Sequence, residues 1–329
     1  VKVSLLNFTI TVGGLEEQLL NVVVANEMPD LSEQRAGLVL SNAANNKALY
    51  DIESEILRLL STSTGNILDD SVLIETLAQS KITSEDIKQK MIEATAIEDE
   101  IVVQSELYRP VAKRSSLLYF VISDLGDVDP MYQYSLPWFT MLFVRGIAAA
   151  TNANDLDQRV INLNDYFTFS VYQNICRSLF ERHKLLFSFS LVVKILQGED
   201  MVNSLEYRFL LSGISTKHIE APLPESDWLE ANAWSELCEM SGLDCFSEFP
   251  TNFAAKIDEW QKVFDAADAH AVPFPAPYDK ITHLQRLCIL RCLRRDKIEL
   301  GMQAFIAAEF GQKYIDPPPF DLKICYDDS

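Results

Sequence analysis

The sequence has little of what catalysis or a turn-rich fold requires. It contains only 11 glycines in 329 residues, which favours a helix-rich chain over a β fold with many tight turns. The phosphate-binding pattern GxxxxGK[ST] is absent, as are GxGxxG, HExxH, GxSxG and the EF-hand loop. The four histidines, His183, His218, His270 and His283, lie far apart with no Cys or carboxylate at metal-ligand spacing. We therefore expect no catalytic residue, no bound cofactor and no metal site in this segment.

Basic residues are also scarce. Lys and Arg number 28 against 48 Asp and Glu, which gives a formal net charge of −20. Such a chain repels nucleic acids and anionic membranes, so neither is expected as a partner. The most apolar run, residues 185–196, contains Lys194 and is too short to span a bilayer.

The six cysteines do not form the framework of a small disulfide-rich domain. Cys288 and Cys292 share a helix face at i, i+4, but no second pair completes a zinc site. We expect free, buried thiols in the reducing cytosol, and therefore a protein of the cytoplasm or cytoskeleton. Hydrophobic residues make up 48% of the chain, enough for a substantial core.

Residues 30–107 are predicted to form a long helical hairpin. Apolar residues recur at steps of three and four in two arms, separated by the turn-favouring run STSTGN at 61–66. The predicted seam between the arms consists of Leu38, Leu49, Ile52, Ile56, Leu59, Leu73, Leu77, Ile87, Met91 and Ile101. Arms of roughly 30 residues would reach about 45 Å, which favours a projecting coiled coil. The alternative is two ordinary helices packed flat on a bundle.

Polar residues interrupt this pattern. Asn42, Asn45 and Asn46 break the apolar stripe of the first arm. A polar residue at a seam lowers stability but can fix the register. Thr83–Asp86 resembles a capping box and could restart the second helix.

On either side of the hairpin the sequence predicts one strand and several helices. Residues 1–12 alternate like a strand, whose sheet we expect upstream, and a helix follows over 13–29. Further helices are expected over 108–220. The block 221–329 is predicted to be helical too, with one helix over Asn252–Ala269 and a stiff polyproline-type linker over 272–278.

A small charged cluster surrounds a proline after the hairpin: Glu106, Arg109, Lys113 and Arg114. One arginine could reach a phosphate or the acidic face of a neighbouring module. The simpler interpretation is that these side chains pair with local acids or cap the helix.

Seven motifs, in order along nearly the whole chain, resemble the motor of dynein heavy chains. They are VSLLNFTIT, VVANEMPDLSEQR, GNILDD, YRPVAKRSSLLYFVISDL, DPMYQYSLPWF, LFERHKLLFSFSL and YIDPPPFDL. The resemblance implies a mainly α segment of a ring of six AAA+ modules. Residues 1–12 would be the last strand of the large subdomain of the fifth module, and 13–29 the first helix of its small subdomain. Residues 30–107 would be the strut, or buttress. The helical small subdomain would occupy 108–220, and a helical connector to the start of the sixth module 221–329.

The forms YRPVAKRSSLLYF and HKLLFSF resemble the axonemal branch, which implies a cilium or flagellum. The resemblance also implies that the strut couples ring movements to the stalk and regulates microtubule affinity, with ATP or ADP and Mg bound in other modules. Its implied partners are the stalk coiled coil, neighbouring AAA+ modules, other dynein subunits and, indirectly, the microtubule. Arg109 and Arg114 occupy the region where AAA+ modules can carry a phosphate-sensing arginine. Two alternatives stay open: a freestanding helical scaffold whose hairpin docks a protein, and an enzyme using the Arg109–Arg114 cluster.

Overall fold

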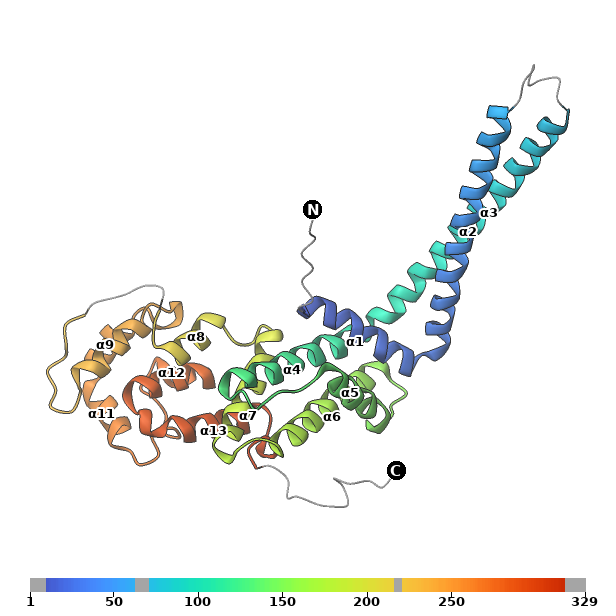
Figure 1. Ribbon diagram of the computed structural model, residues 1–329. Coiled ribbons are helices and arrows are strands. Elements are labelled where there is room, and N and C mark those ends of the chain that lie inside the picture. The colour runs from blue at the N-terminus through green and yellow to red at the C-terminus, as the bar shows by residue number, and fades with distance from the viewer. Residues whose placement is uncertain (1–9, 63–70, 216–220, 317–329) are drawn as a thin grey trace. The chain divides into compact units, whose positions relative to one another are not determined.

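The computed structural model describes residues 10–62, 71–215 and 221–316, and this part of the chain is helical throughout, without a strand (Figure 1). The first helices are α1 (Val12–Glu27), α2 (Pro29–Thr62), α3 (Ser71–Glu106), α4 (Arg109–Val128), α5 (Leu136–Ala149), α6 (Leu156–Cys176) and α7 (Glu181–Gly198). They are followed by α8 (Ser204–Ser212), α9 (Ala231–Met240), α10 (Phe249–Ala255), α11 (Ile257–Asp265), α12 (His283–Leu293) and α13 (Ile298–Glu309). Short 3₁₀ turns include η2 (Asp244–Phe246), η3 (Tyr278–Lys280), η4 (Arg295–Lys297) and η5 (Gln312–Tyr314). The mainly α class predicted from the sequence is confirmed.

The chain divides into two compact units. One comprises Val1–Ser116 and Thr140–Asn164, and the other Leu117–Phe139 and Asp165–Ser329. The boundaries of the five predicted segments remain predictions. Within the described ranges no helix combines the length and apolarity that crossing a membrane requires.

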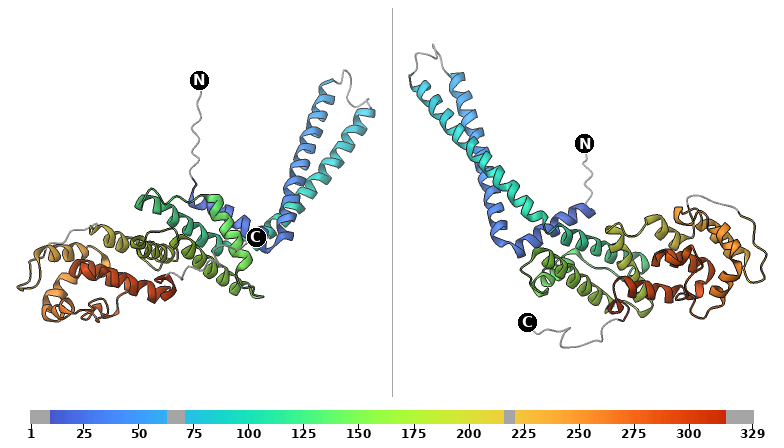
Figure 2. Two further views of the ribbon diagram at one scale, coloured as in Figure 1. Left: turned by 60° about the horizontal axis from the view of Figure 1, so that its bottom comes forward. Right: turned by 180° about the vertical axis from the view of Figure 1, so that it is seen from behind.

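In the first unit, α2 and α3 run side by side as an antiparallel hairpin that extends away from α1 (Figures 1 and 2). Helix α1 buries Leu15, Leu19 and Val23 almost completely. The hairpin is far more exposed, and the described apolar side chains that it buries are those of Ile87, Ala94 and Ile101 of α3. Its helices are therefore held by a narrow line of contacts, as in a coiled coil.

The helix boundaries correct several predictions in this unit. Most of the predicted strand lies outside the described residues, but Val12 is the first residue of α1, since the Thr11 side chain accepts a hydrogen bond from the Gly14 amide at 3.1 Å. The restart at Thr83 is wrong. Helix α3 is continuous there, and the Thr83 hydroxyl donates to the Gln79 carbonyl within the helix at 3.0 Å.

In the second unit, α12 packs on α8, α9 and α13, and α13 packs on α7. An aromatic cluster fills the region around α10 and α11, with Phe249, Phe253, Trp260, Phe274 and Tyr278 all buried. The single helix predicted over Asn252–Ala269 is wrong, because the chain breaks at Lys256 between α10 and α11. The polyproline linker is wrong too: Phe274 lies in the cluster and the Ala276–Pro277 peptide is cis.

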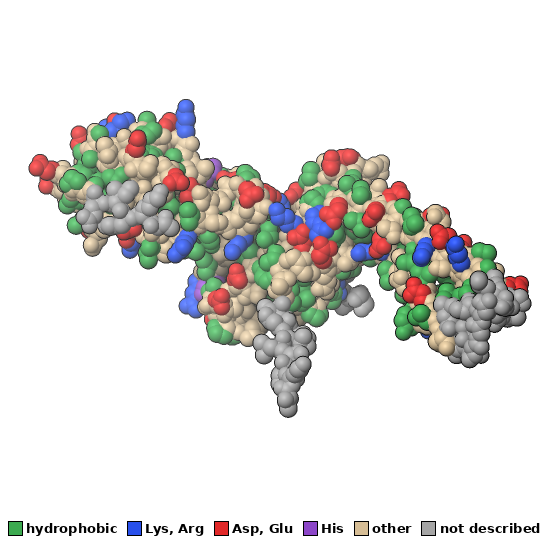
Figure 3. All heavy atoms as spheres, turned by 90° about the horizontal axis from the view of Figure 1, so that it is seen from above, with side chains coloured by type: hydrophobic (Ala, Val, Ile, Leu, Met, Phe, Trp, Pro, Cys, Tyr) green, Lys and Arg blue, Asp and Glu red, His purple; other side chains and the backbone are tan. Residues whose placement is uncertain are grey.

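The surface matches the acidic composition. On the face shown in Figure 3, acidic side chains are scattered widely, and Lys and Arg side chains occur in small separate groups. Nothing on this face resembles the broad basic surface that nucleic acids bind.

Candidate functional site: the seam and base of the hairpin

Most of the predicted seam residues that the structure describes are buried or half-buried. Ile87 and Ile101 of α3 are 9% and 2% exposed. The other described members are half-buried, namely Leu38, Leu49, Ile52, Ile56, Leu77 and Met91. The side chains of Leu59 and Leu73 lie outside the described part. The structure thus brings the eight described residues to the interior side of the two arms.

The seam is partly polar, as the asparagines of the first arm indicated. Asn42 and Asn45 are half-buried among the apolar residues, whereas Asn46 is exposed. Toward the tip, Ile52 faces Gln79, Ser80 and Thr83 across a groove of about 390 Å³. The Asn42 Oδ1 atom is buried and accepts no hydrogen bond from any described residue. The two arms are therefore held together less tightly than a fully apolar coiled coil.

Replacing Asn42 with leucine should stabilise the hairpin. Removing a buried polar group that lacks a partner is expected to raise the free energy of separating the arms by about 1–3 kcal/mol. Amide hydrogen exchange across α2 and α3 measures this energy. Asn46→Leu, on the exposed side, should change it by less than about 0.5 kcal/mol. Equal effects of both substitutions would contradict the conclusion that the buried Asn42 side chain destabilises the seam.

A proline marks each end of the base of the hairpin. At the entry, only Met28 separates α1 from α2, and Pro29 is the first residue of α2. At the exit, α3 ends at Glu106, and Pro110 lies in the first turn of α4, where its missing amide hydrogen is not needed. Pro110 therefore lies in the first turn of a new helix, α4. The connections at both ends of the hairpin are short, so they allow little independent movement.

Arg109 joins the exit of the hairpin to α1. Its guanidinium binds Glu106 with both Nε and Nη2, the former at 2.8 Å, and its Nη1 binds Glu16 at 3.2 Å and Glu17. The hydrogen bonds that Arg109 donates to Glu106, and then to Glu17, raise the pKa of Arg109, while the guanidinium lowers the pKa of Glu106. This is the local pairing that the simpler interpretation anticipated. Arg114 lies half-buried farther along α4, and a phosphate-sensing role for either arginine stays a prediction.

Arg159 of α6 is the buried centre of the base, and sequence reasoning missed it. Its side chain is 7% exposed and holds Glu27, the last residue of α1, through Nη2 at 2.7 Å and Nε at 3.0 Å. The same guanidinium donates to the carbonyl oxygens of Ile147, Ala150 and Thr151 at 2.8–3.0 Å. These include the carbonyls that the end of α5 would otherwise leave without partners.

Tyr108, two residues after the end of α3, lies close to the charges of the Glu27–Arg159 ion pair. Burial raises the pKa of Tyr108, and the charge of Glu27 raises it further. Glu27, two residues before the hairpin, and Tyr108, two residues after it, therefore share one environment with Arg159. We call Glu27, Tyr108, Arg109 and Arg159, with Glu16, Glu17 and Glu106, the base cluster.

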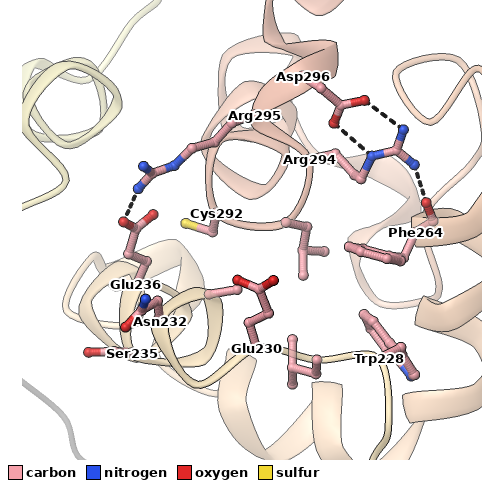
Figure 4. Close-up of a pocket in the computed structure, with 13 residues that line it drawn as sticks. Trp228, Glu230, Asn232, Ser235, Glu236, Phe264, Cys292, Arg294, Arg295 and Asp296 are labelled. Carbon is pink, nitrogen blue, oxygen red and sulfur yellow. Dashed lines mark hydrogen bonds and ion pairs between the residues drawn. The ribbon is translucent and has the colours of Figure 1, made fainter.

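A cavity of the second unit offers no comparable anion site. It has a volume of about 770 Å³ and lies between α9 and α12 (Figure 4). Both arginines that line it are paired, Arg294 with Asp296 at 2.8 Å and Arg295 with Glu236. Burial raises the pKa of Cys292 in its wall to about 12, so this thiol is protonated at neutral pH.

The remaining thiols also lack a reactive setting. Cys176, Cys238 and Cys288 are buried, as predicted, but Cys245 is exposed, which corrects the expectation that every thiol is buried. Cys325 lies outside the described residues. Among the residues that the structure describes, no group of three or more His, Cys, Asp and Glu side chains could hold a metal ion.

Comparisons with known proteins agree with this architecture. The family of the ATP-binding dynein motor region matches residues 1–87, which cover α1, α2 and part of α3. Homology to axonemal dynein heavy chains extends over the whole chain. The chain is 43% identical to dynein axonemal heavy chain 1 of Homo sapiens over 329 residues and 40% identical to dynein axonemal heavy chain 3 of Mus musculus. It is 39% identical to the Dynein-1-beta heavy chain, flagellar inner arm I1 complex, of Chlamydomonas reinhardtii. The chain covers only 7–8% of the length of these relatives.

These findings assign the chain to the dynein motor-region family. More specifically, it is a segment of the motor region of an axonemal dynein heavy chain, and it is located in the axoneme of cilia and flagella.

Proposed function

We propose that this segment couples movements of the dynein ring to the stalk, with the α2–α3 hairpin as the strut, and so regulates microtubule affinity. The observation that carries the proposal is the base cluster. It fixes both ends of a long hairpin to α1, α5 and α6 within one unit. A hairpin fixed in this way moves with the helices that hold its base.

The length of the hairpin supports a mechanical role. Its arms contain 34 and 36 residues, which correspond to about 50 Å at the rise of an α-helix. Most of this length is not needed to bury the core of the unit, because the seam is narrow and the outer faces are exposed. The surplus reach is suited to contacting a distant element of the same heavy chain.

In the parent protein we propose the following sequence of events. ATP hydrolysis in other modules, with bound Mg, moves the modules that contain this segment. The strut displaces one helix of the stalk, and the changed register of the stalk alters microtubule binding at its tip. This scheme has the two sites and the two-state element that allosteric coupling requires. The parent would be a minus-end-directed microtubule motor that works with other dynein subunits in the axoneme.

A freestanding scaffold is a weaker explanation. The chain aligns along its entire length with a small share of much longer relatives. An enzyme built on Arg109 has little support, since three glutamates occupy its guanidinium.

Placing a charge in the seam tests the proposal in the full motor. Ile87→Asp puts a carboxylate at a position that is 9% exposed and should separate the arms. Microtubule-stimulated ATPase activity is expected to fall at least about tenfold, while basal ATPase activity stays within about twofold, because the hydrolysing modules are untouched.

Ile97→Asp is the matched control, since Ile97 lies on the same helix and is 45% exposed. It should leave stimulation near that of the unsubstituted motor. Normal stimulation in Ile87→Asp, with arm separation verified by hydrogen exchange, would refute the coupling role.

A further inference from the structure

Arg286, near the start of α12, is a half-buried arginine without an acidic partner. Its Nε donates to the backbone carbonyl oxygen of His270 at 3.1 Å, and its Nη2 donates to that of Val272. The guanidinium also lies over the ring of Phe274, with 4.0 Å between its carbon and the ring centroid. Within the described part of the chain, no Asp or Glu forms an ion pair with Arg286, and its Nη1 makes no hydrogen bond. The side chain is thus fixed in place, but its charge is not balanced.

This lack of a counter-charge at Arg286 is unusual in so acidic a chain. Asp and Glu outnumber Lys and Arg by 48 to 28. Burial lowers the pKa of Arg286, and no neighbouring acid opposes that effect. A half-buried cation costs free energy unless hydrogen bonds or an opposite charge compensate it. Neutral carbonyl groups and an aromatic ring compensate only part of this cost. An anion beside Arg286 would complete the compensation.

Arg294, which directly follows the same helix, shows what this arrangement of groups binds. It donates to the backbone carbonyl oxygens of Phe264 and Ala266 and lies over the ring of Phe264, 5.6 Å from the centroid. Its Nε and Nη2 bind the two oxygens of the Asp296 carboxylate, both at 2.8 Å (Figure 4). Arg286 and Arg294 therefore share the two carbonyl acceptors and the aromatic ring. They differ in the carboxylate, which Arg286 lacks.

A cavity lies beside Arg286 where that carboxylate would fit. Its volume is about 330 Å³, and its wall includes Ile281, Leu290 of α12, and Gly301 and Ala304 of α13. Gly301 and Ala304 have no side chain beyond a methyl group, so α13 leaves this space unfilled. The volume is at the lower end of the range of small-molecule pockets. The cavity therefore has room for a carboxylate group and a few further atoms.

The other ionisable residues of the cavity limit the charge of its ligand. Asp279 lines the cavity, is exposed and forms no ion pair with Arg286. Its repulsion disfavours a doubly charged anion, such as a phosphate dianion, more than a singly charged one. The Nδ1 of His283, also on the wall, is already paired with Glu309 at 2.9 Å. The surroundings thus favour a single negative charge next to Arg286.

We propose that this cavity is a binding site for one carboxylate group, held by Arg286. Nη1 donates a charge-assisted hydrogen bond to the carboxylate. Phe274 and the two carbonyl oxygens already hold the guanidinium, so binding costs little side-chain entropy. The carboxylate belongs either to a small molecule or to an acidic side chain elsewhere in the heavy chain, and the experiment separates these two sources. The site lies outside the hairpin and does not depend on the strut function.

Hydrogen exchange in the full motor tests the site, with sodium acetate as the probe and the ionic strength held constant with sodium chloride. Acetate at about ten times its dissociation constant should slow exchange of residues 270–274 and of the first turn of α12 about tenfold. Inorganic phosphate should have a smaller effect, because of the charge of Asp279. Acetate also stabilises folded proteins by its exclusion from their surface, so the same titration is made on substituted motors.

Three substitutions provide the controls. Arg286→Gln should abolish the acetate effect, whereas Arg294→Gln, which removes an arginine already bound to Asp296, should retain it. Ala304→Glu places a carboxylate on the cavity wall and keeps Arg286. It should slow exchange without acetate and make residues 270–274 insensitive to acetate. A folding defect in Arg286→Gln therefore does not decide the result.

The unsubstituted motor distinguishes the two sources of the carboxylate. A response to acetate that requires Arg286 identifies a small molecule. Exchange that is already as slow as in Ala304→Glu, does not respond to acetate and is accelerated by Arg286→Gln identifies an acidic side chain of the heavy chain. The proposal is overturned by fast exchange without any response, by an equal response in Arg286→Gln, or by a phosphate effect as large as that of acetate.

Discussion

Replacing Arg159 with leucine is expected to loosen the base of the hairpin by about 3–5 kcal/mol, a large share of the stability of an ordinary domain. The substitution leaves the half-buried Glu27 carboxylate without its partner and removes a donor from three carbonyl oxygens near the end of α5. The loss should appear as faster amide exchange in α1, α5 and the first turns of α2, measured on the full motor.

Arg145→Leu is the control for this prediction. Arg145 lies on α5 in the same unit but is exposed, so its loss should change exchange by less than about 0.5 kcal/mol. A base cluster that stabilises the hairpin also predicts that Glu27→Gln has a smaller effect than Arg159→Leu, because an amide still accepts hydrogen bonds. Unchanged protection of α1 in Arg159→Leu would remove the main support for a rigid base.

The second large loss of stability is expected when Trp260 is replaced with alanine. This side chain is 1% exposed and lies 5.2–5.4 Å, centroid to centroid, from the rings of Phe249, Phe253 and Phe274. Trp260→Ala creates a cavity in the middle of this cluster and should lower the free energy of unfolding of the region by about 3–5 kcal/mol.

Hydrogen exchange of α10 and α11 in the full motor measures the loss at Trp260. Trp138→Ala is the matched substitution, since Trp138 is half-buried in the second unit and contacts Tyr134 at 5.5 Å. It should cost clearly less than Trp260→Ala. Equal losses would show that the aromatic cluster does not hold this region together.

The hairpin was predictable because its information is local. Steps of three and four apolar residues specify a helix face, and two such arms separated by a turn-favouring run specify a hairpin. Ile87 and Ile101 could be assigned to the seam on this basis. Asn42 could be recognised as an interruption, but its buried oxygen without a partner follows only from the packing of the arms.

The base cluster was not predictable, because its pairs are distant in sequence. Arg159 and Glu27 are separated by 132 positions, and Arg109 and Glu17 by 92. Nothing in the spacing of charges distinguishes Arg159 from an exposed arginine such as Arg145. The aromatic cluster was missed for a related reason: Phe274 lies in a proline-rich run that resembles an extended linker, and the hydrophobic gain of burying its ring outweighs that local tendency.

The short connections at the base have a geometric consequence. With one residue, Met28, between α1 and α2, a tilt of α1 is not absorbed by a loop and passes directly into the hairpin. If the hairpin, about 50 Å long, rotates by about 5° about its base, its far end moves by about 4 Å. This distance is close to the 5.4 Å pitch of an α-helix. In the strut function that we propose, a rotation of about 5° at the base would therefore displace the far end of the hairpin by most of one helical turn.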